Sequence, residues 1–359
     1  MCTSCAAVDQ VKLEGFGQKM VDLLNSGAMT LMLSLGHRTG LFDVMAGEQP
    51  LTSQELAQKA ELSERYVREW LGAVTTGGIV SFDEQTQRYH LPAEHAAFLT
   101  RAAAPNNMAA SMQWFSVLGG AEDEVFQAFR HGRGVPYSAY RRFNEVMAEE
   151  SAQTTMGALD KFILPVVPGL EAKLEAGIDV IDVGCGAGRA LLHLARRFPR
   201  SRFTGIDLLQ DAIDDAQAEA QLRALGNVRF RQEDAAAWAE SKAYDLVFTF
   251  DAVHDQANPA RVLRNIHAAL RPGGTYLMQD IKASSSVARN MHYPLAPFIY
   301  TISCMHCMSV SLANGGVGLG AAWGRELATQ MLQEAGFREV RVEELEHDPI
   351  NYYYIMNKD

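Results

Sequence analysis

Four positions in the second half of the chain have the types and spacing of a nucleotide-binding loop. Asp182 is followed by Gly184, Gly186 and Gly188, and Arg189 stands where a dinucleotide-binding loop has its third glycine or an alanine. Glycines at such a turn let the backbone bend tightly and approach a ligand, and the helix that follows offers free N–H groups. This spacing predicts a cofactor site and argues against NAD as its occupant.

Two further acids extend this pattern along the chain. Asp207 ends the next apolar run, 19 residues beyond Gly188, where a carboxylate can accept hydrogen bonds from ribose hydroxyls. Asp234 follows the third apolar run and can accept from an adenine amino group. We expect three neighbouring residues to contact the same cofactor: Leu208, Ala235 and Phe250.

A histidine–aspartate pair, His254 and Asp255, follows the fourth apolar run. An imidazole in such a loop can take a proton from a hydroxyl group during a transfer reaction. His254 is therefore a candidate catalytic residue, with Asp255 and Asp251 as the neighbouring acids. The residues also leave open a plain alternative, in which His254 only caps the following helix.

Alternating strands and helices would bring all these residues to one edge of a sheet. The apolar runs predict strands at 178–183, 202–207, 228–232, 244–250 and 274–280, with helices between them. Such alternation builds a parallel sheet whose ligands lie at the carboxyl ends of the strands. The last two predicted strands, 339–345 and 350–357, are joined too closely for a parallel crossover and should pair antiparallel.

The ordered set of glycines and acids resembles the class I S-adenosylmethionine-dependent methyltransferases over residues 171–359. The run from His254 to the RPGG turn is similar to that of small-molecule O-methyltransferases with an N-terminal winged-helix domain, in which this histidine is the general base. The resemblance implies that His254 is the general base and that Asp255 or Asp251 orients or tunes it. Gln256 departs from that family, which usually has an aromatic residue there. The resemblance implies an α/β, Rossmann-like seven-stranded sheet of order 3-2-1-4-5-7-6 with the last strand antiparallel. It also implies S-adenosylmethionine as cofactor and a small-molecule acceptor, with O-methylation favoured.

Two other functions remain open at this point: an S-methyltransferase acting on thiols, and a winged-helix transcription regulator that senses the cofactor. The segment HCMSVSLANGGVGLGAAWG resembles a bacterial group of winged-helix methyltransferases, some of them described as regulators. Neither a (D/N)PP(Y/F) motif nor a Pro-Cys pair follows the fourth strand, so methylation of nucleic-acid bases is not expected.

Residues 282–324 are expected to cover the acceptor site. Aromatic and methionine side chains with few polar groups suit a mainly apolar pocket. The predicted substrate contacts are His292, Tyr300, His306 and Trp323. Cys304 and Cys307, like Cys2 and Cys5, have a C-x-x-C spacing, but 299 residues separate the two pairs and we expect no metal. A site that handles thiols or metalloids near Cys304 and Cys307 stays a minor alternative.

The first part of the chain has the outline of a winged helix. A helix is predicted over 27–41, a capping box at Thr52 and Glu55 opens a short helix, Ser63 caps a helix over 64–76, and a hairpin follows at 79–91. The second helix carries balanced charge, unlike a DNA-reading helix, and the apolar run 29–35 suits packing against a second subunit. We predict a dimerisation and lid domain over 1–110, a helical linker closing over the cofactor at 111–170, and a catalytic domain over 171–359.

Composition limits the partners that the protein can have. The chain has 359 residues, 48% of them hydrophobic, and a formal net charge of −11. The apolar content excludes disorder as the main state, and the negative charge disfavours nucleic acid and anionic membranes. The most hydrophobic stretch, 295–310, contains Pro297 and is shorter than the ~20 residues of a membrane helix. We expect a cytoplasmic homodimer.

Overall fold

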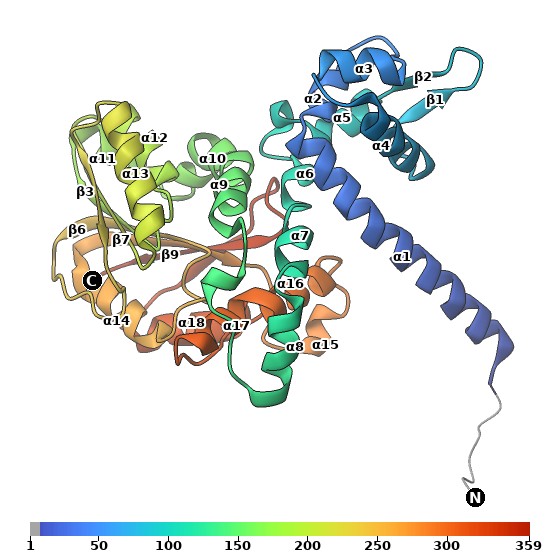
Figure 1. The fold of residues 1–359 in the computed structure, drawn as a ribbon. Coiled ribbons are helices and arrows are strands. Elements are labelled where there is room, and N and C mark those ends of the chain that lie inside the picture. Colours follow the sequence, from blue (N-terminus) through green and yellow to red (C-terminus); the bar gives the residue numbers. More distant parts are fainter. Residues whose placement is uncertain (1–7) are drawn as a thin grey trace, which may run out of the picture. The chain divides into compact units, whose positions relative to one another are not determined.

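The structure, a computed structural model, describes residues 8–359 (Figure 1). They form two compact units, the first ending at Ser116 and the second spanning Val117–Asp359. The division falls close to the limit predicted at residue 110. Of the linker predicted over 111–170, residues 117–170 belong to the second unit.

The first unit is helical with one small hairpin, as predicted. Its buried core includes Phe42, Leu56, Trp70 and Leu71. The hairpin strands pair antiparallel through Ser81 to Asp83 and Arg88 to His90. Its helices and strands are α1 (Gln10–Arg38), α2 (Leu41–Met45), α3 (Ser53–Lys59), α4 (Glu64–Thr76), β1 (Ser81–Asp83), β2 (Arg88–His90), α5 (Ala93–Leu99) and α6 (Met108–Ser111).

The capping box at α3 is confirmed. The Glu55 amide donates to the Thr52 hydroxyl at 3.2 Å, and the Glu55 carboxylate accepts from the Thr52 amide at 2.8 Å. The cap predicted at Ser63 is only half right, because this residue occupies the N-cap position of α4 without any side-chain capping bond. Helix α4 therefore begins at the predicted residue, but without the predicted capping bond.

Helix α1 begins far earlier than the predicted residue 27. Asp9 caps it by accepting from the amides of Val11 and Lys12, which satisfies donors that a helix start leaves free. Gly15 and Gly17 lower the helix propensity of this first part, so the sequence pattern understated it. Six apolar side chains here are half or more exposed: Val11, Leu13, Phe16, Val21, Leu23 and Leu24.

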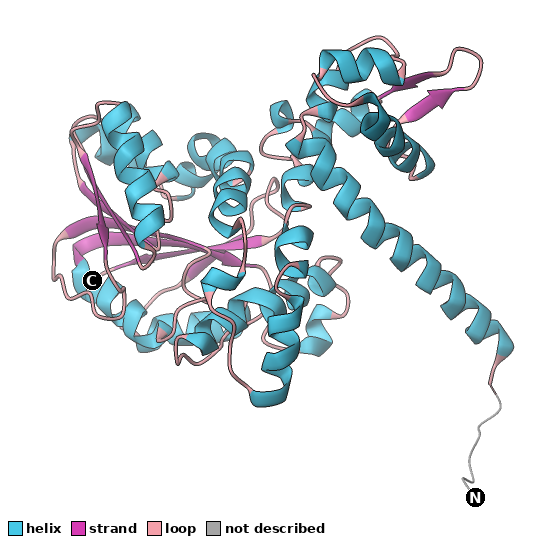
Figure 2. Ribbon diagram, viewed as in Figure 1, coloured by secondary structure: helices cyan, strands magenta, loops and turns pink. Residues whose placement is uncertain are grey.

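A seven-stranded sheet forms the centre of the second unit, drawn in magenta in Figure 2. Its order is β5-β4-β3-β6-β7-β9-β8, which confirms the predicted 3-2-1-4-5-7-6 arrangement. The first five strands in this order are parallel, and β9 pairs antiparallel with both β7 and β8. The strands are β3 (Asp179–Val183), β4 (Arg202–Asp207), β5 (Val228–Gln232), β6 (Tyr244–Phe250), β7 (Leu270–Ile281), β8 (Arg341–Glu343) and β9 (Asn351–Asn357).

Alternate residues of the central strands supply two separate cores. Val180 belongs to a cluster with residues of α12 and α13, whereas Ile181 belongs to a cluster with residues of α14 and α18. Successive side chains of a strand point to opposite faces, so a parallel sheet covered by helices on both faces needs apolar residues throughout. The helices on the two faces are visible in Figure 1: α11 (Leu170–Ala176), α12 (Arg189–Arg197) and α13 (Gln210–Leu222) cover one, α14 (Pro259–Ala269) and α18 (Gly324–Glu334) the other.

The remaining helices surround the carboxyl edge of the sheet. They are α7 (Trp114–Gly119), α8 (Glu122–His131), α9 (Phe143–Gln153), α10 (Thr155–Ala158), α15 (Val287–Asn290), α16 (Ala296–Ile302) and α17 (Met308–Ala313). The stretch Ala296–Ala313 is, by length and composition, the one helix of residues 8–359 that could cross a membrane. Within it, Ile299 and Cys307 are buried and pack in one cluster with Ala321.

Candidate functional site

The glycine loop after β3 has the backbone shape that its sequence predicts. Gly184, Gly186 and Gly188 all have positive φ, at 81°, 51° and 66°. A Cβ on Gly184 would lie 2.5 Å from the Cβ of Ala252, and one on Gly188 would lie 2.3 Å from the ring of Phe230. Nothing lies within 4 Å of the corresponding position on Gly186, so the middle of the loop faces open space.

Asp207, at the end of β4, is fixed by backbone donors. Its Oδ2 accepts from the Gly186 amide at 2.8 Å, and its Oδ1 accepts from the Leu209 amide at 2.9 Å. Burial raises the pKa of this carboxyl, while the same amide bonds oppose the rise. The carboxylate therefore stays oriented across the glycine loop.

Asp182 and Asp234 complete the acids around the loop. Asp182 is only 2% exposed, and its Oδ1 has no hydrogen-bond partner in the described part of the chain. Burial, together with the charge of Asp207, raises the pKa of Asp182 to about 8. Asp234 accepts from the Ala236 amide at 2.8 Å, which fixes the turn after β5.

These residues line a cavity of about 1000 Å³ in the second unit. We call the part around the glycine loop the cofactor end. Of the nine predicted cofactor contacts, the cavity wall contains Asp182, Gly184, Gly186, Asp207, Leu208, Asp234, Ala235 and Phe250. Gly188 is not in the wall; its close approach to Phe230 gives it a packing role beneath the loop.

The opposite part of the cavity, which we call the acceptor end, is built by the loop after β6. Asp251, Asp255 and Gln256 line it, together with Tyr137 and Phe143 from the segment before the sheet. Neither aromatic residue was among the predicted substrate contacts, although both belong to the segment 111–170 that was predicted to close over the cofactor. The cavity is therefore bounded by residues more than 100 positions apart in the chain.

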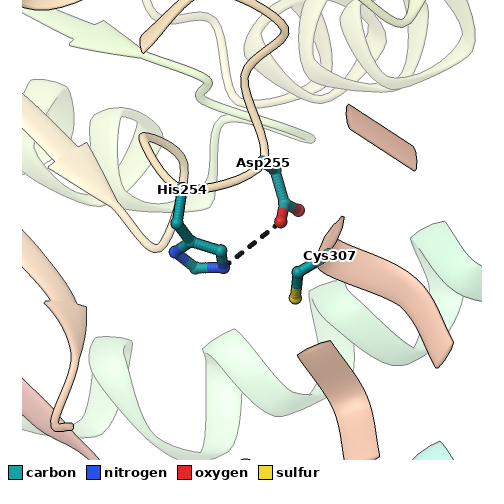
Figure 3. Close-up of side chains that lie close together, drawn as sticks. All are labelled: His254, Asp255 and Cys307. Atoms are coloured by element: carbon teal, nitrogen blue, oxygen red, sulfur yellow. Dashed lines mark ion pairs between the residues drawn. The ribbon is translucent and has the colours of Figure 1, made fainter. Parts of the chain in front are cut away.

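His254 lies just behind this wall and is only 3% exposed. Its Nδ1 lies 2.8 Å from Oδ1 of Asp280, at the end of β7, and its Nε2 lies 3.2 Å from Oδ1 of Asp255. Figure 3 shows the imidazole pointing toward Asp255, with the Cys307 thiol on the same side. The histidine is thus held between two carboxylates.

Asp280 is the main site residue that sequence reasoning missed. It is fully buried, and the same Oδ1 also accepts from the Trp323 indole N–H at 2.9 Å. Of the two carboxylates predicted to orient or tune His254, that of Asp255 lies 3.2 Å from Nε2 of the imidazole, while Asp251 accepts from the Gln279 amide at 3.0 Å and interacts with His254 through its charge. A signal was available, because Asp280 ends the predicted strand 274–280 at the ligand edge.

The charges around His254 decide its protonation state. Burial alone would lower the pKa of this histidine, but the charges of Asp280 and Asp255 outweigh it and raise the pKa well above its usual value. The imidazolium form is therefore favoured at neutral pH. Burial, followed by the charge of Asp255, raises the pKa of the Cys307 thiol to about 12, so the sulfur stays protonated.

The other predicted substrate contacts lie outside the cavity wall. His306 is buried and stacks on Phe143 with ring centroids 4.5 Å apart, and burial lowers its pKa to about 4. The Tyr300 hydroxyl accepts from the Asn290 amide at 2.9 Å. Trp323 is buried against Asp280. His306 and Trp323 therefore contact site residues from behind, whereas Tyr300 contacts α15.

His292 lies at a different place. It lines a second hollow of about 820 Å³, together with Lys282, Arg325 and Tyr352, and this hollow shares no residue with the cavity around the glycine loop. A substrate role for His292 at the first cavity is therefore not supported by its position.

His254, Asp255 and Cys307 also form a compact group of metal-type ligands. One donor atom from each lies within 4.8 Å of the others, and nitrogen, oxygen and sulfur donors of these kinds are ones that zinc accepts. Cys304 and Cys307 are both free thiols, while Cys2 and Cys5 lie outside the described residues. The absence of a metal stays a prediction.

Two protein families match the chain. Residues 27–101 match the Rv2258c-like winged HTH domain, and residues 174–342 match a methyltransferase domain. The first match covers the end of α1, helices α2 to α5 and the hairpin of the first unit. The second covers β3 to β8, including the glycine loop and the His254 loop.

Individual relatives agree with these matches. A trans-aconitate 2-methyltransferase of Azoarcus sp. is 31% identical over 106 residues, which are 30% of this chain and only 40% of that relative's length. Human N-acetylserotonin methyltransferase in complex with SAM has a TM-score of 0.68 at 16% identity, over 99% of both chains. An O-methyltransferase family protein from Burkholderia thailandensis also has a TM-score of 0.68 at 16% identity, over 98% of this chain and 99% of that chain. At such identities, the structural likeness shows a shared fold.

Proposed function

Since this chain joins a winged-helix domain to a class I methyltransferase domain, whose cofactor is S-adenosylmethionine, we propose that it methylates a small-molecule acceptor. A hydroxyl is the favoured acceptor group and His254 the general base. One observation carries the proposal: an imidazole held by Asp280 lies directly behind a cavity that the glycine loop and its acids enclose. Because Asp280 fixes one ring nitrogen, the other, which lies beside Asp255, is the one that can exchange a proton with the acceptor.

The cofactor end has the groups that S-adenosylmethionine requires. Asp207 and Asp234 offer carboxylate oxygens for ribose hydroxyls and the adenine amino group, and Gly186 leaves room for a ligand beside the backbone. The unpartnered Oδ1 of Asp182 can accept from a cationic N–H donor, which would remove the cost of burying it alone. The bound cofactor supplies a methyl group activated by a positively charged sulfur.

At the acceptor end, the residues of the chain have to hold the acceptor and take its proton. Asp255 lines the cavity and its Oδ1 lies 3.2 Å from Nε2 of His254, so it connects the base with the acceptor. His254 must be neutral to act, and its raised pKa opposes this. Positive charge in the cavity would favour the neutral imidazole, because like charges disfavour each other. Water exclusion and alignment supply the rest of the catalysis.

Calorimetry with S-adenosylmethionine and S-adenosylhomocysteine tests the proposal. We expect both to bind and Asp207→Ala to weaken them about 100-fold, because two charge-assisted contacts are lost. Asp211→Ala is the matched control, since Asp211 is exposed at the start of α13 and lies outside the cavity wall. If neither ligand binds the unaltered protein, the proposal is wrong. If the control loses as much affinity as Asp207→Ala, the assignment of the cofactor end is wrong.

We propose that the protein is a cytoplasmic homodimer. The exposed apolar side chains of α1, among them Val11 and Leu24, support burial against a second copy. Sedimentation of the unaltered chain and of Leu24→Glu measures this directly. A monomer in both cases would contradict the proposal.

A regulator that senses the cofactor is the second candidate, because the first unit matches a winged HTH domain. Against it, both arginines of α4 form ion pairs within the helix, Arg65 with Glu69 and Arg68 with Glu64, which leaves little positive charge for phosphate contacts. A gel shift with the gene's own upstream DNA, with and without S-adenosylmethionine, decides between the two. Specific, salt-dependent retardation would favour the regulator.

A further inference from the structure

Within residues 8–359, the wall of the acceptor end contains acidic side chains and no basic ones. Ten acidic and two basic side chains line the whole cavity. The two basic residues are Arg189, the first residue of α12, and Arg223, which follows α13 and is paired with Glu219 at 2.5 Å. Both therefore belong to the helices beside the cofactor end. The loop after β6, which builds the acceptor end, contributes Asp251 and Asp255 to the wall and no basic residue.

Asp251 has an oxygen that lacks a donor. Its backbone adopts a φ of 50°, rare outside glycine, and the Gln279 amide holds its Oδ2 at 3.0 Å. Its Oδ1 is buried and has no hydrogen-bond partner among the described residues. A buried acceptor without a donor costs free energy. Burial, followed by the charge of Asp280, raises the pKa of Asp251 well above its usual value, so a cation that arrives beside this carboxyl favours its ionised form and is bound favourably in return.

Two aromatic rings lie at the same end. Tyr137 and Phe143 both line the cavity, with ring centroids 5.3 Å apart in an edge-to-face arrangement. The Tyr137 hydroxyl lies 3.4 Å from Oδ2 of Asp255, which places the ring beside a carboxylate. Aromatic rings combined with carboxylates attract ammonium groups and repel carboxylates.

We infer that the methyl acceptor carries a protonated amine, which is held at the acceptor end by Asp251 and by the rings of Tyr137 and Phe143. This inference rests on the proposed function and adds the chemical class of the substrate. The ammonium lies against the carboxyl of Asp251 and thereby turns the rest of the molecule toward the loop that bears His254. Acceptors with a carboxylate in the same place are rejected, because they meet Asp251 and Asp255 without a compensating cation.

Binding of three matched phenols to the full chain saturated with S-adenosylhomocysteine tests this inference. Tyramine, 4-hydroxyphenethyl alcohol and 3-(4-hydroxyphenyl)propionate differ only in an ammonium, a hydroxyl or a carboxylate at the end of the side chain. We expect tyramine to bind about tenfold or more tightly than the propionate, with the alcohol between them. Asp251→Asn should remove most of this preference, because the amide keeps the shape of the side chain and loses the charge.

Asp123→Asn is the control for a general effect of net charge, since Asp123 is exposed on α8 and outside the cavity wall. It should keep the full preference for tyramine. Equal binding of the three phenols, preference for the propionate, no binding of tyramine, or an unchanged preference in Asp251→Asn would each overturn the inference. Failure of S-adenosylhomocysteine to bind at the outset would instead overturn the proposed function, so the two failures are distinguishable.

Discussion

The two ends of the cavity hold buried charge in different ways. At the cofactor end, Asp207 is fixed by the backbone amides of Gly186 and Leu209. At the acceptor end, His254 is fixed by the side chains of Asp280 and Asp255, which themselves titrate. Backbone amides keep one charge state at every pH, whereas a cluster of side chains shares its protons. The first arrangement suits a site that only binds, and the second suits a site that moves a proton.

Replacing His254 should have the largest effect, and it should change the rate of methyl transfer without changing the affinity for the cofactor. His254→Gln should lower methyl transfer about 10²- to 10⁴-fold, which is the usual contribution of a positioned base. Affinity for S-adenosylhomocysteine should stay within about twofold, because His254 is not in the cavity wall and its loss removes no ligand contact. Release of S-adenosylhomocysteine with an accepted phenol measures the rate. A rate that is nearly retained at alkaline pH would instead point to a thiol acceptor, which needs no base.

Replacing Asp280 would test whether side-chain charge sets the pKa of His254. Asp280→Asn removes a carboxylate 2.8 Å from Nδ1, so the pKa of His254 should fall by about 1–3 units. Because the imidazole must be neutral to accept a proton, the rise of activity with pH should move to lower pH. Nitrogen-resolved NMR titration follows the imidazole directly, with His254→Gln identifying its signal. An unmoved titration would refute the role of Asp280.

Replacing Gly184 would disturb both ends of the cavity at once, because this glycine packs against the loop after β6. Gly184→Ala puts a Cβ 2.5 Å from Ala252 and keeps a φ of 81°, so the glycine loop and the loop after β6 must both move. We expect both a weaker affinity for S-adenosylhomocysteine and a slower transfer, each by about tenfold. Gly47→Ala is a suitable control, because Gly47 also has positive φ but has open space around it, in the first unit. Loss of affinity without loss of rate would show that the ends are independent.

Replacing Asp182 would give the smallest effect, on stability. Since its folded pKa of about 8 lies above the ordinary value of 3.8, the free protein loses stability as pH rises between those values. Asp182→Asn should therefore raise the Tm of the free protein at pH 8 by a few degrees, as about 1 kcal/mol corresponds to 2–4 °C in a domain of this size. At pH 4 the gain should vanish. Thermal denaturation at both pH values checks this, and S-adenosylmethionine should stabilise the variant less than the unaltered chain.

The cofactor end could be predicted from the sequence and much of the acceptor end could not. Asp182, the glycine loop and Asp207 act through neighbours in the chain or across adjacent strands, so short spacings specify them. Asp280 meets His254 from 26 residues away, through the pairing of β6 with β7. Tyr137 reaches Asp255 from 118 residues away. The contact of Tyr137 depends on packing, which single-sequence patterns do not encode, whereas Asp280 could have been singled out from its place at the end of a predicted strand.

The same limit applies to the side chains of the cover segment 282–324. Its aromatic and histidine residues were predicted to face the substrate, but His306 and Trp323 are buried behind the site and His292 lines another hollow. A helix pattern shows which residues are apolar, but it does not show which of two apolar faces meets a cavity. In the first unit, the exposed residues of α1 were missed for a related reason, because its glycines hide the helical signal.

Trp323 gives this molecule an internal optical reporter. Its indole N–H and the imidazole of His254 share one oxygen of Asp280, so a proton that leaves the imidazole changes the field at the indole ring. Because Trp323 is buried, water quenches its emission little. Of the four tryptophans in the sequence, Trp70 and Trp114 belong to other elements and Trp238 contacts Tyr244. A chain that retains only Trp323 would therefore show the protonation of the base as a change in fluorescence, without labels and during turnover.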